Sequence, residues 1–210
     1  MICVSIGSGN PAEAKKVLRK SGFIELRADL LDWKPEEYRD VILSGGKTVF
    51  TCRPGKFMDD ERLALFEMAS ASGAKYIDVE VDSEASFLDS VRKIIGQSAT
   101  ELIISYHNYE LTPNAETLES LLNDCFLAGA DVAKLACRVY SPADSSRLLS
   151  LYTISGRKVV LGMGKMGKIT RVAATLLGAE FTFASAGEGE ATAEGQLSYE
   201  QMKEIIKKIQ

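Results

Sequence analysis

The chain has 210 residues, of which 46% are hydrophobic and 26% charged, and its formal net charge is −4. This is an ordinary globular composition. The net negative charge argues against nucleic acid as a partner. No apolar run approaches 18 residues and there is no signal-peptide pattern, so no membrane partner is predicted. The four cysteines have no CxxC spacing and only one histidine accompanies them, which predicts free thiols in a reducing cytoplasm and no metal site.

Along the chain, segments with strand character alternate with segments of helical periodicity. The strands are expected at 2–6, 23–28, 47–53, 75–81, 101–107, 131–138, 157–163 and 180–185. The helices are expected at 11–21, 35–43, 60–72, 87–95, from Thr112-Pro113 to about 125, 142–152, 170–177 and 199–209. Asn10, Pro11 and Glu13 form a helix-start signal before the first of these helices.

Strict strand–helix alternation predicts a parallel sheet covered by helices. Eight such units predict an α/β fold of one domain, a (β/α)₈ TIM barrel spanning residues 1–210. The main alternative is a doubly wound open sheet. Its dinucleotide fingerprint requires a third glycine that the segment from Gly7 to Ala12 lacks, so the barrel is preferred.

Lys134 lies in the middle of the short apolar strand 131–138, and lysine is rarely buried unless it is paired or functional. Because desolvation disfavours the ammonium form, such a lysine can present a neutral amine that forms a Schiff base with a ketone or aldehyde. The ordinary alternative is that Lys134 ends its strand and extends its ammonium to water. Taken by itself, this strand favours the ordinary alternative.

In a TIM barrel, catalytic residues lie at the carboxyl ends of the strands. The polar residues at the expected strand ends are Ser5, Glu25, Arg27, Arg53, Asp78, Glu80, His107 and Lys134, followed by the loops carrying Arg171 and Gln196. Because side chains alternate along a strand, Glu25 and Arg27 share one face, and two charges on a lumen face are hard to explain as packing. The fifth and sixth strands are neighbours, which places His107 and Lys134 within reach of one substrate.

Each of these residues also has an ordinary explanation. A lone histidine is most often a satisfied structural residue, Arg27 and Arg53 fit surface ion pairs, and the glycine-rich segment 162–168 fits a flexible connection. The predicted barrel favours a functional explanation over these ordinary ones, because it brings three arginines, a histidine and a strand-embedded lysine to one end of the barrel.

The sequence resembles the type I 3-dehydroquinate dehydratases, which are (β/α)₈ Schiff-base enzymes of the shikimate pathway. The resemblance covers essentially the whole chain. Its motifs are VSI with Ser5, ELRAD with Glu25 and Arg27, TCR with Arg53, YIDVEV, ISYHNY with His107, VAKLA with Lys134, GKMGKITR with Arg171 and ATAEGQ with Gln196. Each motif is weak alone, and the set in this order is specific.

The resemblance implies that Lys134 forms an imine with the C3 ketone of 3-dehydroquinate. His107 would take a proton from C2 and protonate the departing C1 hydroxyl in a syn elimination that gives 3-dehydroshikimate, a step toward aromatic amino acids. Arg171 would bind the substrate carboxylate. The other implied substrate-binding residues are Ser5, Glu25, Arg27, Arg53, Thr192 and Gln196. No metal or other cofactor is implied; family members are often dimers, so a homodimer is expected.

The chain departs from the family pattern at three places. Phe57 stands where bacterial members carry a glutamate that orients the catalytic histidine, so Glu80, or a carboxylate among residues 59–61, is expected to take over. In the lid around Gln196, Thr192 replaces a serine and Glu194 a proline; the hydroxyl is kept, whereas losing the proline is expected to loosen the lid. The short chain shows no N-terminal hairpin for the barrel floor, as in archaeal members.

Two alternatives remain open at this stage. A class I aldolase acting on phosphorylated sugars would use the same amine and a phosphate cradle of backbone amides after the seventh and eighth strands. A non-catalytic ligand-binding barrel is the other alternative, and Phe57 is the feature that favours it.

Overall fold

The computed structural model describes residues 1–187 and 189–209, in which eight strands alternate with eight helices. The strands are β1 (Ile2–Ile6), β2 (Phe23–Arg27), β3 (Lys47–Thr51), β4 (Tyr76–Glu80), β5 (Glu101–Asn108), β6 (Val132–Arg138), β7 (Lys158–Met163) and β8 (Thr182–Ser185). The helices are α1 (Pro11–Ser21), α2 (Pro35–Ile42), α3 (Asp59–Ala71), α4 (Ala85–Ile95), α5 (Ala115–Leu127), α6 (Pro142–Ser150), α7 (Lys168–Leu176) and α8 (Tyr199–Ile209). The single domain predicted over 1–210 includes Glu188 and Gln210, which lie outside the described residues.

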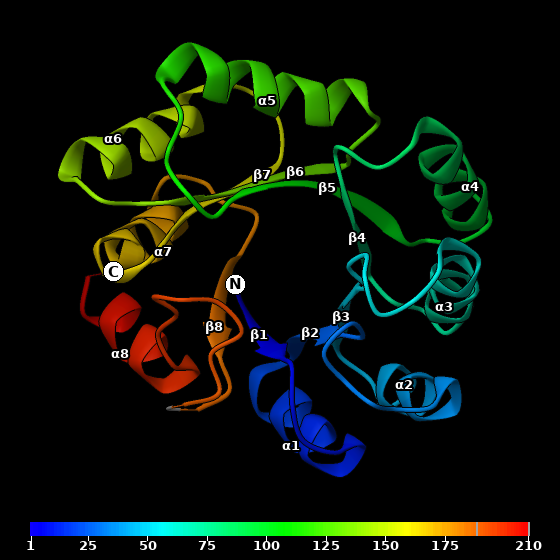
Figure 1. Cartoon of the computed structure of the whole chain (residues 1–210). Coiled ribbons are helices and arrows are strands. Elements are labelled where there is room, and N and C mark those ends of the chain that lie inside the picture. The colour runs from blue at the N-terminus through cyan, green and yellow to red at the C-terminus, as the bar shows by residue number, and fades with distance from the viewer. Residues whose placement is uncertain (188, 210) are drawn as a thin grey trace.

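The strands form one parallel sheet in the order β7-β6-β5-β4-β3-β2-β1-β8. The sheet curls into a nearly closed ring with the helices outside it (Figure 1). At the seam between its two ends, the Glu180 N–H donates to the Lys158 carbonyl oxygen at 2.9 Å. The predicted (β/α)₈ barrel is therefore confirmed.

Local signals in the sequence account for most element boundaries. Asn10 caps α1 through a reciprocal bond with Glu13, and Gly22 ends that helix with φ +72°, a left-handed conformation that favours glycine. The prediction that Thr112-Pro113 starts the fifth helix is wrong. Helix α5 begins at Ala115 because the Asn114 side chain caps it, while the Thr112 hydroxyl donates to the Arg138 carbonyl oxygen.

Side-chain alternation divides the strands into an outer face and a lumen face. The outer face packs with the helices into the main hydrophobic core. The lumen floor holds an aromatic cluster of Phe23, Tyr76 and Phe181. Below this cluster, Glu180 accepts from Tyr76 and pairs with Arg157. The floor is thus filled by side chains of the barrel strands and their flanking residues.

Helices in the described part of the chain are all too short or too polar to cross a bilayer.

Candidate active site

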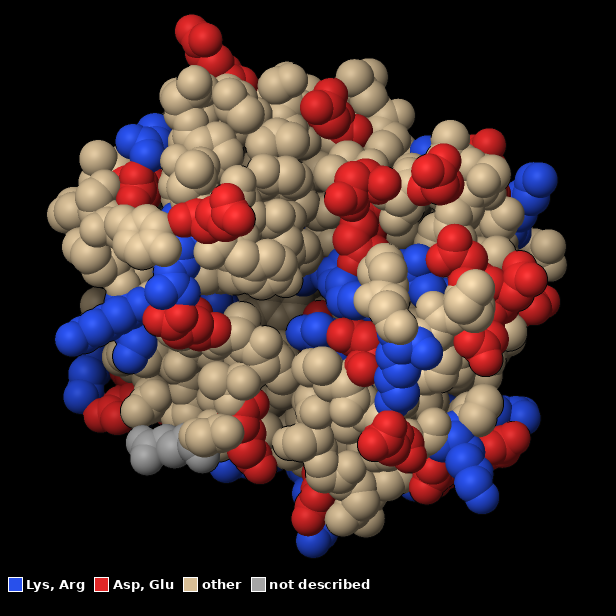
Figure 2. Space-filling view, viewed as in Figure 1, with Lys and Arg blue, Asp and Glu red and all other residues tan. Residues whose placement is uncertain are grey.

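A pocket of about 270 Å³ opens at the carboxyl ends of the strands, near the lower end of the range for small-ligand sites. Figure 2 shows it as a hollow near the middle of one face, with basic side chains beside it. Its lining includes the predicted residues Ser5, Glu25, Arg27, Arg53, His107, Lys134, Arg171, Thr192 and Gln196. The structure therefore brings together residues that lie up to 191 positions apart in the chain.

Lys134 points into the lumen from the middle of β6, and its side chain is buried. The Nζ atom donates to Asp78 Oδ2 at 2.8 Å and lies 4.5 Å from the centroid of the Phe183 ring. Asp78 is itself fully buried on β4. Burial would raise the pKa of Asp78, but Arg53 and Lys134 beside it outweigh this and hold the pKa well below its usual range, so the carboxylate stays ionised.

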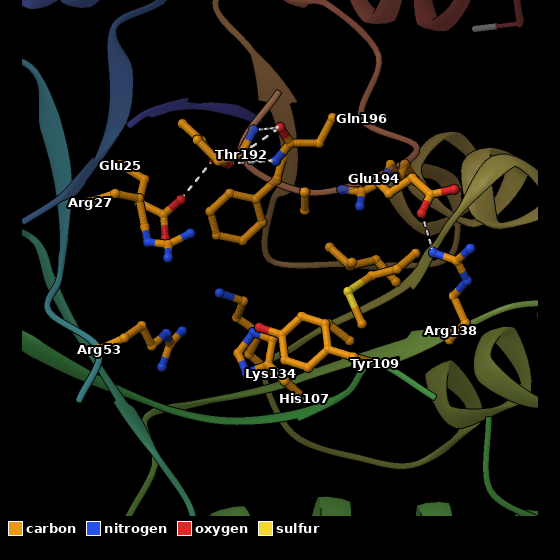
Figure 3. Close-up of a pocket in the computed structure, with 17 residues that line it drawn as sticks. Glu25, Arg27, Arg53, His107, Tyr109, Lys134, Arg138, Thr192, Glu194 and Gln196 are labelled. Atoms are coloured by element: carbon orange, nitrogen blue, oxygen red, sulfur yellow. Dashed lines mark hydrogen bonds and ion pairs between the residues drawn. The ribbon is translucent and has the colours of Figure 1, made fainter. Parts of the chain in front are cut away.

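His107 lies on β5, and strand pairing sets it opposite Ala136, two residues beyond Lys134. Its imidazole and the Lys134 amine face the same cavity (Figure 3). Burial, and then the positive charges of Arg53 and Lys134, lower the pKa of His107 well below its ordinary value. The imidazole is therefore neutral near pH 7 and can accept a proton. The Tyr109 ring stacks beside it at 6.0 Å between centroids.

Four arginines line the pocket, and Arg138 at the end of β6 pairs with Glu194. The other three differ in how they are bound. Arg53 donates to Asp78 at 2.9 Å and to the Ser105 hydroxyl at 3.0 Å, and also contacts Glu80. Arg27 forms a two-pronged bond with Asp29 at 3.0 and 2.6 Å. Arg171 is only 1% exposed, and its Nε and Nη2 atoms have no hydrogen-bond partner among the described residues. Burial lowers the pKa of Arg171 to about 10.

A buried guanidinium without a partner is costly and is usually matched by an anionic group. Arg171 supplies free N–H donors in the planar geometry that binds a carboxylate on two points. It is positioned by α7, which starts directly after the glycine-rich connection from β7. The Nε atom of Arg138 also has no partner among the described residues, but Arg138, Arg27 and Arg53 each pair with a carboxylate. Among the described residues, Arg171 is thus the pocket arginine without an acidic partner.

Glu25 lines the pocket from β2, where it accepts from the Ser5 hydroxyl at 2.7 Å and from the Thr51 hydroxyl at 2.8 Å. Both hydroxyls lie on the strands next to β2 and face the lumen. The carboxylate is thereby fixed, and Ser5 keeps acceptor capacity for a ligand hydroxyl. Polar groups on this wall suit a ligand with several hydroxyls.

The segment 189–197, named the lid below, covers part of the pocket. The Gln196 amide contacts the Ser5 hydroxyl at 3.5 Å and the Thr192 hydroxyl at 3.2 Å. The Glu194 carboxylate pairs with Arg138 at the end of β6, and the Glu194 carbonyl oxygen accepts from the Gly164 N–H at 2.9 Å. These two bonds attach the lid to the barrel rim at the position where the family carries a proline.

Glu80 does not orient His107 in this structure, which corrects the expectation from sequence. Its carboxylate oxygens are bound by Arg53 and by Arg62, the latter at 3.2 Å. Asp59 and Glu61 are also occupied, by the Arg62 side chain and by the Met58 backbone N–H. Phe57 packs against the main hydrophobic core. Within the described ranges, His107 forms no hydrogen bond, and Asp78 is the carboxylate whose charge acts on it.

Sequence reasoning missed several residues in or beside the pocket. Asp78 is fully buried and is not part of the pocket lining, but it binds Lys134. Its place two residues before Glu80 predicts the lumen face but does not predict this contact. Tyr109 and Arg138 line the pocket. They follow β5 and end β6, and their sequence positions carried no signal that separated them from ordinary rim residues.

The fold and this pocket define a (β/α)₈ barrel in which an amine and an imidazole face one cavity. The sequence matches the family described as type I 3-dehydroquinase over residues 2–210, and the chain belongs to that family. A protein of Methanococcus maripaludis strain C6 named 3-dehydroquinate dehydratase is 34% identical over 223 residues, covering 100% of both chains. A protein of the same name from Desulfotalea psychrophila is 34% identical and covers 98% of this chain and 96% of its own.

A solved structure supports the same relationship. The 3-dehydroquinate dehydratase of Aquifex aeolicus VF5 superposes with a TM-score of 0.86 at 32% identity. The alignment covers 99% of this chain and 98% of that one. The match therefore extends over the whole barrel, including the strands that carry the pocket.

Proposed function

We propose that this chain catalyses the removal of water from 3-dehydroquinate to give 3-dehydroshikimate, a step of the shikimate pathway toward aromatic amino acids, through an imine on Lys134. The observation that carries the proposal is the buried Lys134 amine in a cavity that also holds His107 and Arg171, two of whose nitrogens have no partner in the described part of the chain. Membership of the type I 3-dehydroquinase family supports it.

The chemistry begins when Lys134 gives a proton to the neutral His107 and the resulting amine adds to the C3 ketone. His107 returns this proton to the hydroxyl of the adduct, which leaves as water. The product is a protonated imine, which withdraws electrons and acidifies the neighbouring C2–H bond. His107 is the group suited to remove this proton, because its lowered pKa keeps the ring neutral. The enamine then expels the C1 hydroxyl, which leaves as water with the proton returned by His107. Hydrolysis of the imine releases product and restores the amine.

Substrate binding is assigned to the rest of the pocket. Arg171 is proposed to bind the carboxylate, because its free donors match a two-point contact. The ring hydroxyls are assigned to Ser5, Glu25, Arg27, Arg53, Thr192 and Gln196. The lid carries two of these residues, so closing it would complete the binding site and exclude water.

One observation weighs against the aldolase alternative. Its phosphate would need free backbone N–H groups after β7 and β8. After β7, the Gly162 N–H already donates to the Thr170 hydroxyl at 2.7 Å and the Gly164 N–H to the Glu194 carbonyl oxygen. A Cβ on Gly167 would lie 2.5 Å from the Gly162 backbone. The glycines in this connection therefore serve close packing, and the amides named here are already used.

The experiment for the proposed function is direct. Purified protein is mixed with 3-dehydroquinate, and the conjugated enone of 3-dehydroshikimate is followed by its ultraviolet absorbance. Turnover that disappears in Lys134→Met supports the proposal. Lack of turnover in the wild-type chain, with ligand binding retained, would leave the non-catalytic barrel as the better description.

Two wider expectations accompany this proposal. A cytoplasmic location is supported by four buried cysteines that remain free thiols. The homodimer stays a prediction, and light scattering on the purified protein would measure it.

A further inference from the structure

Asp78 is held more tightly than the other acidic side chains of the lumen. One oxygen, Oδ1, accepts from Arg53 at 2.9 Å and from the Ser105 hydroxyl at 2.7 Å. The other, Oδ2, accepts from Lys134 Nζ at 2.8 Å. The side chain is fully buried. Its position is thereby fixed on both oxygens, with one of them directed at the amine.

Lys134 depends on this single carboxylate. Among the described residues, Asp78 is the only hydrogen-bond partner of Nζ, which also lies over the Phe183 ring. The remaining lumen carboxylates are bound elsewhere: Glu25 by two hydroxyls and Glu80 by two arginines. A positive charge on this nitrogen is therefore balanced locally by Asp78.

We propose that Asp78 is the counter-ion of the protonated imine that Lys134 forms with its substrate. The inference rests on the proposed function and extends it to a residue that pattern reasoning left without a role. Imine formation combines the neutral amine, the ketone and one proton, and releases one water. The nitrogen keeps one N–H and a positive charge, and the carboxylate that faced the ammonium now faces the imine.

The charge on Asp78 does not change through the cycle. Arg53 and Ser105 hold its other oxygen, and its low pKa makes it a poor proton acceptor. The protons are therefore moved by His107, while Asp78 supplies a fixed negative charge. Such a preorganised charge stabilises each cationic intermediate without reorganising solvent. The nitrogen is cationic before C2 deprotonation and again after the hydroxyl leaves.

The test compares Asp78→Asn with Glu80→Gln. Both changes replace a carboxylate that binds Arg53 with a neutral amide of similar volume, but only the first removes the negative charge that faces Lys134. Each variant is mixed with 3-dehydroquinate and borohydride, and the fraction of protein carrying the reduced adduct is read by intact mass, alongside kcat and KM. Thermal melting shows that each variant is folded.

For Asp78→Asn we expect kcat to fall about 10²-fold or more, as for other groups that stabilise transition-state charge, and the trapped fraction to fall with it. Glu80→Gln should trap as completely as the wild type. Ser105→Ala keeps the negative charge of Asp78 but removes one hydrogen bond that fixes the carboxylate, so its kcat should fall roughly tenfold. This variant tests the proposal if Asp78→Asn does not fold.

The proposal is overturned if Asp78→Asn traps and turns over within about threefold of Glu80→Gln, or, where Asp78→Asn is unfolded, if Ser105→Ala keeps wild-type kcat. If the proposed function itself is wrong, the wild-type protein forms no adduct at all. The wild-type sample therefore tests the proposed function, and the variants test the role of Asp78.

Discussion

Arg171→Met is expected to make the protein more stable and a worse enzyme. The guanidinium is buried, and two of its nitrogens have no hydrogen-bond partner within residues 1–187 and 189–209. Burial lowers its pKa from the ordinary 12.5 to about 10. At about 1.4 kcal/mol per pKa unit, keeping this group charged costs the folded state about 3 kcal/mol.

The sign of the pH dependence follows from the lowered pKa. At pH 7 the arginine is protonated in both folded and unfolded chains, so the cost is fully present, and it declines only as the pH rises above about 10. Methionine fills much of the same space without a charge. For a chain of this size, a change of about 1 kcal/mol in the free energy of unfolding shifts Tm by about 2–4 °C. Because the substitution also loses some packing, the expected rise in Tm is about 5 °C.

The effect on activity has the opposite direction. Losing a buried, charged contact to the substrate carboxylate costs about 2–5 kcal/mol, which corresponds to a loss of roughly 30-fold to several thousand-fold in kcat/KM. Thermal melting and steady-state kinetics measure the two effects. Melting with saturating product adds a third readout, since the ligand should raise the Tm of the wild type far more than that of the variant.

Arg157 provides the matched control. It is also an arginine of the barrel, but its donors are bound by Glu101 and Glu180 at the barrel floor, so Arg157→Met should lower the Tm. The reasoning is refuted if both arginine variants melt below the wild type by similar amounts, or if Arg171→Met keeps the wild-type kcat/KM.

Three further outcomes are expected. His107→Ala should slow turnover by about 10²–10⁴, the usual contribution of an acid–base residue; a near-normal rate would remove its assigned role. The acidic limb of the wild-type kcat profile should lie below pH 6.5, because His107 must be neutral and its pKa is lowered; a limb above 6.5 would contradict this. Glu194→Gln should raise KM and weaken its dependence on salt, since the lid loses its ion pair with Arg138. Glu190, also in the lid, has no ion pair with another described residue, so Glu190→Gln should behave as the wild type.

Much of the fold was predictable because each βα unit carries its own signals. Apolar strands, helix caps such as Asn10 and terminal glycines such as Gly22 are local, and eight repeats of one pattern fix the barrel. The start of α5 was misplaced because Pro113 looks like a first helical residue, while the bond that Asn114 forms with the Thr117 N–H decides the boundary. Choosing between two adjacent capping signals requires coordinates.

The sequence predicts which residues lie together in the site, but not how their side chains pair. Strand-end position and the two-residue alternation place Lys134, His107 and the acidic pair Asp78 and Glu80 in one lumen. Alternation cannot say which carboxylate meets which cation, since both face inward. The structure shows Glu80 with arginines and Asp78 with Lys134. Pairings of this kind depend on side-chain reach across neighbouring strands, which the sequence does not encode locally.

The lid shows the same limit. Replacing a proline by Glu194 predicted a looser segment, because the backbone loses a constraint. The structure adds two bonds at this residue, one to Arg138 and one to the Gly164 N–H. The partner Arg138 lies 56 positions away in the chain, so its contribution became visible only in the folded barrel.

The most direct test of the account is to locate the covalent intermediate. The wild-type protein is incubated with 3-dehydroquinate and borohydride, digested, and mapped by mass spectrometry. The account predicts one reduced adduct, on the peptide containing Lys134. Lys158 serves as an internal control, because it is also buried, but its Nζ is bound by the Ile154 and Gly156 carbonyl oxygens outside the pocket. An adduct on any lysine other than Lys134, or full turnover without a trapped adduct, would contradict the account.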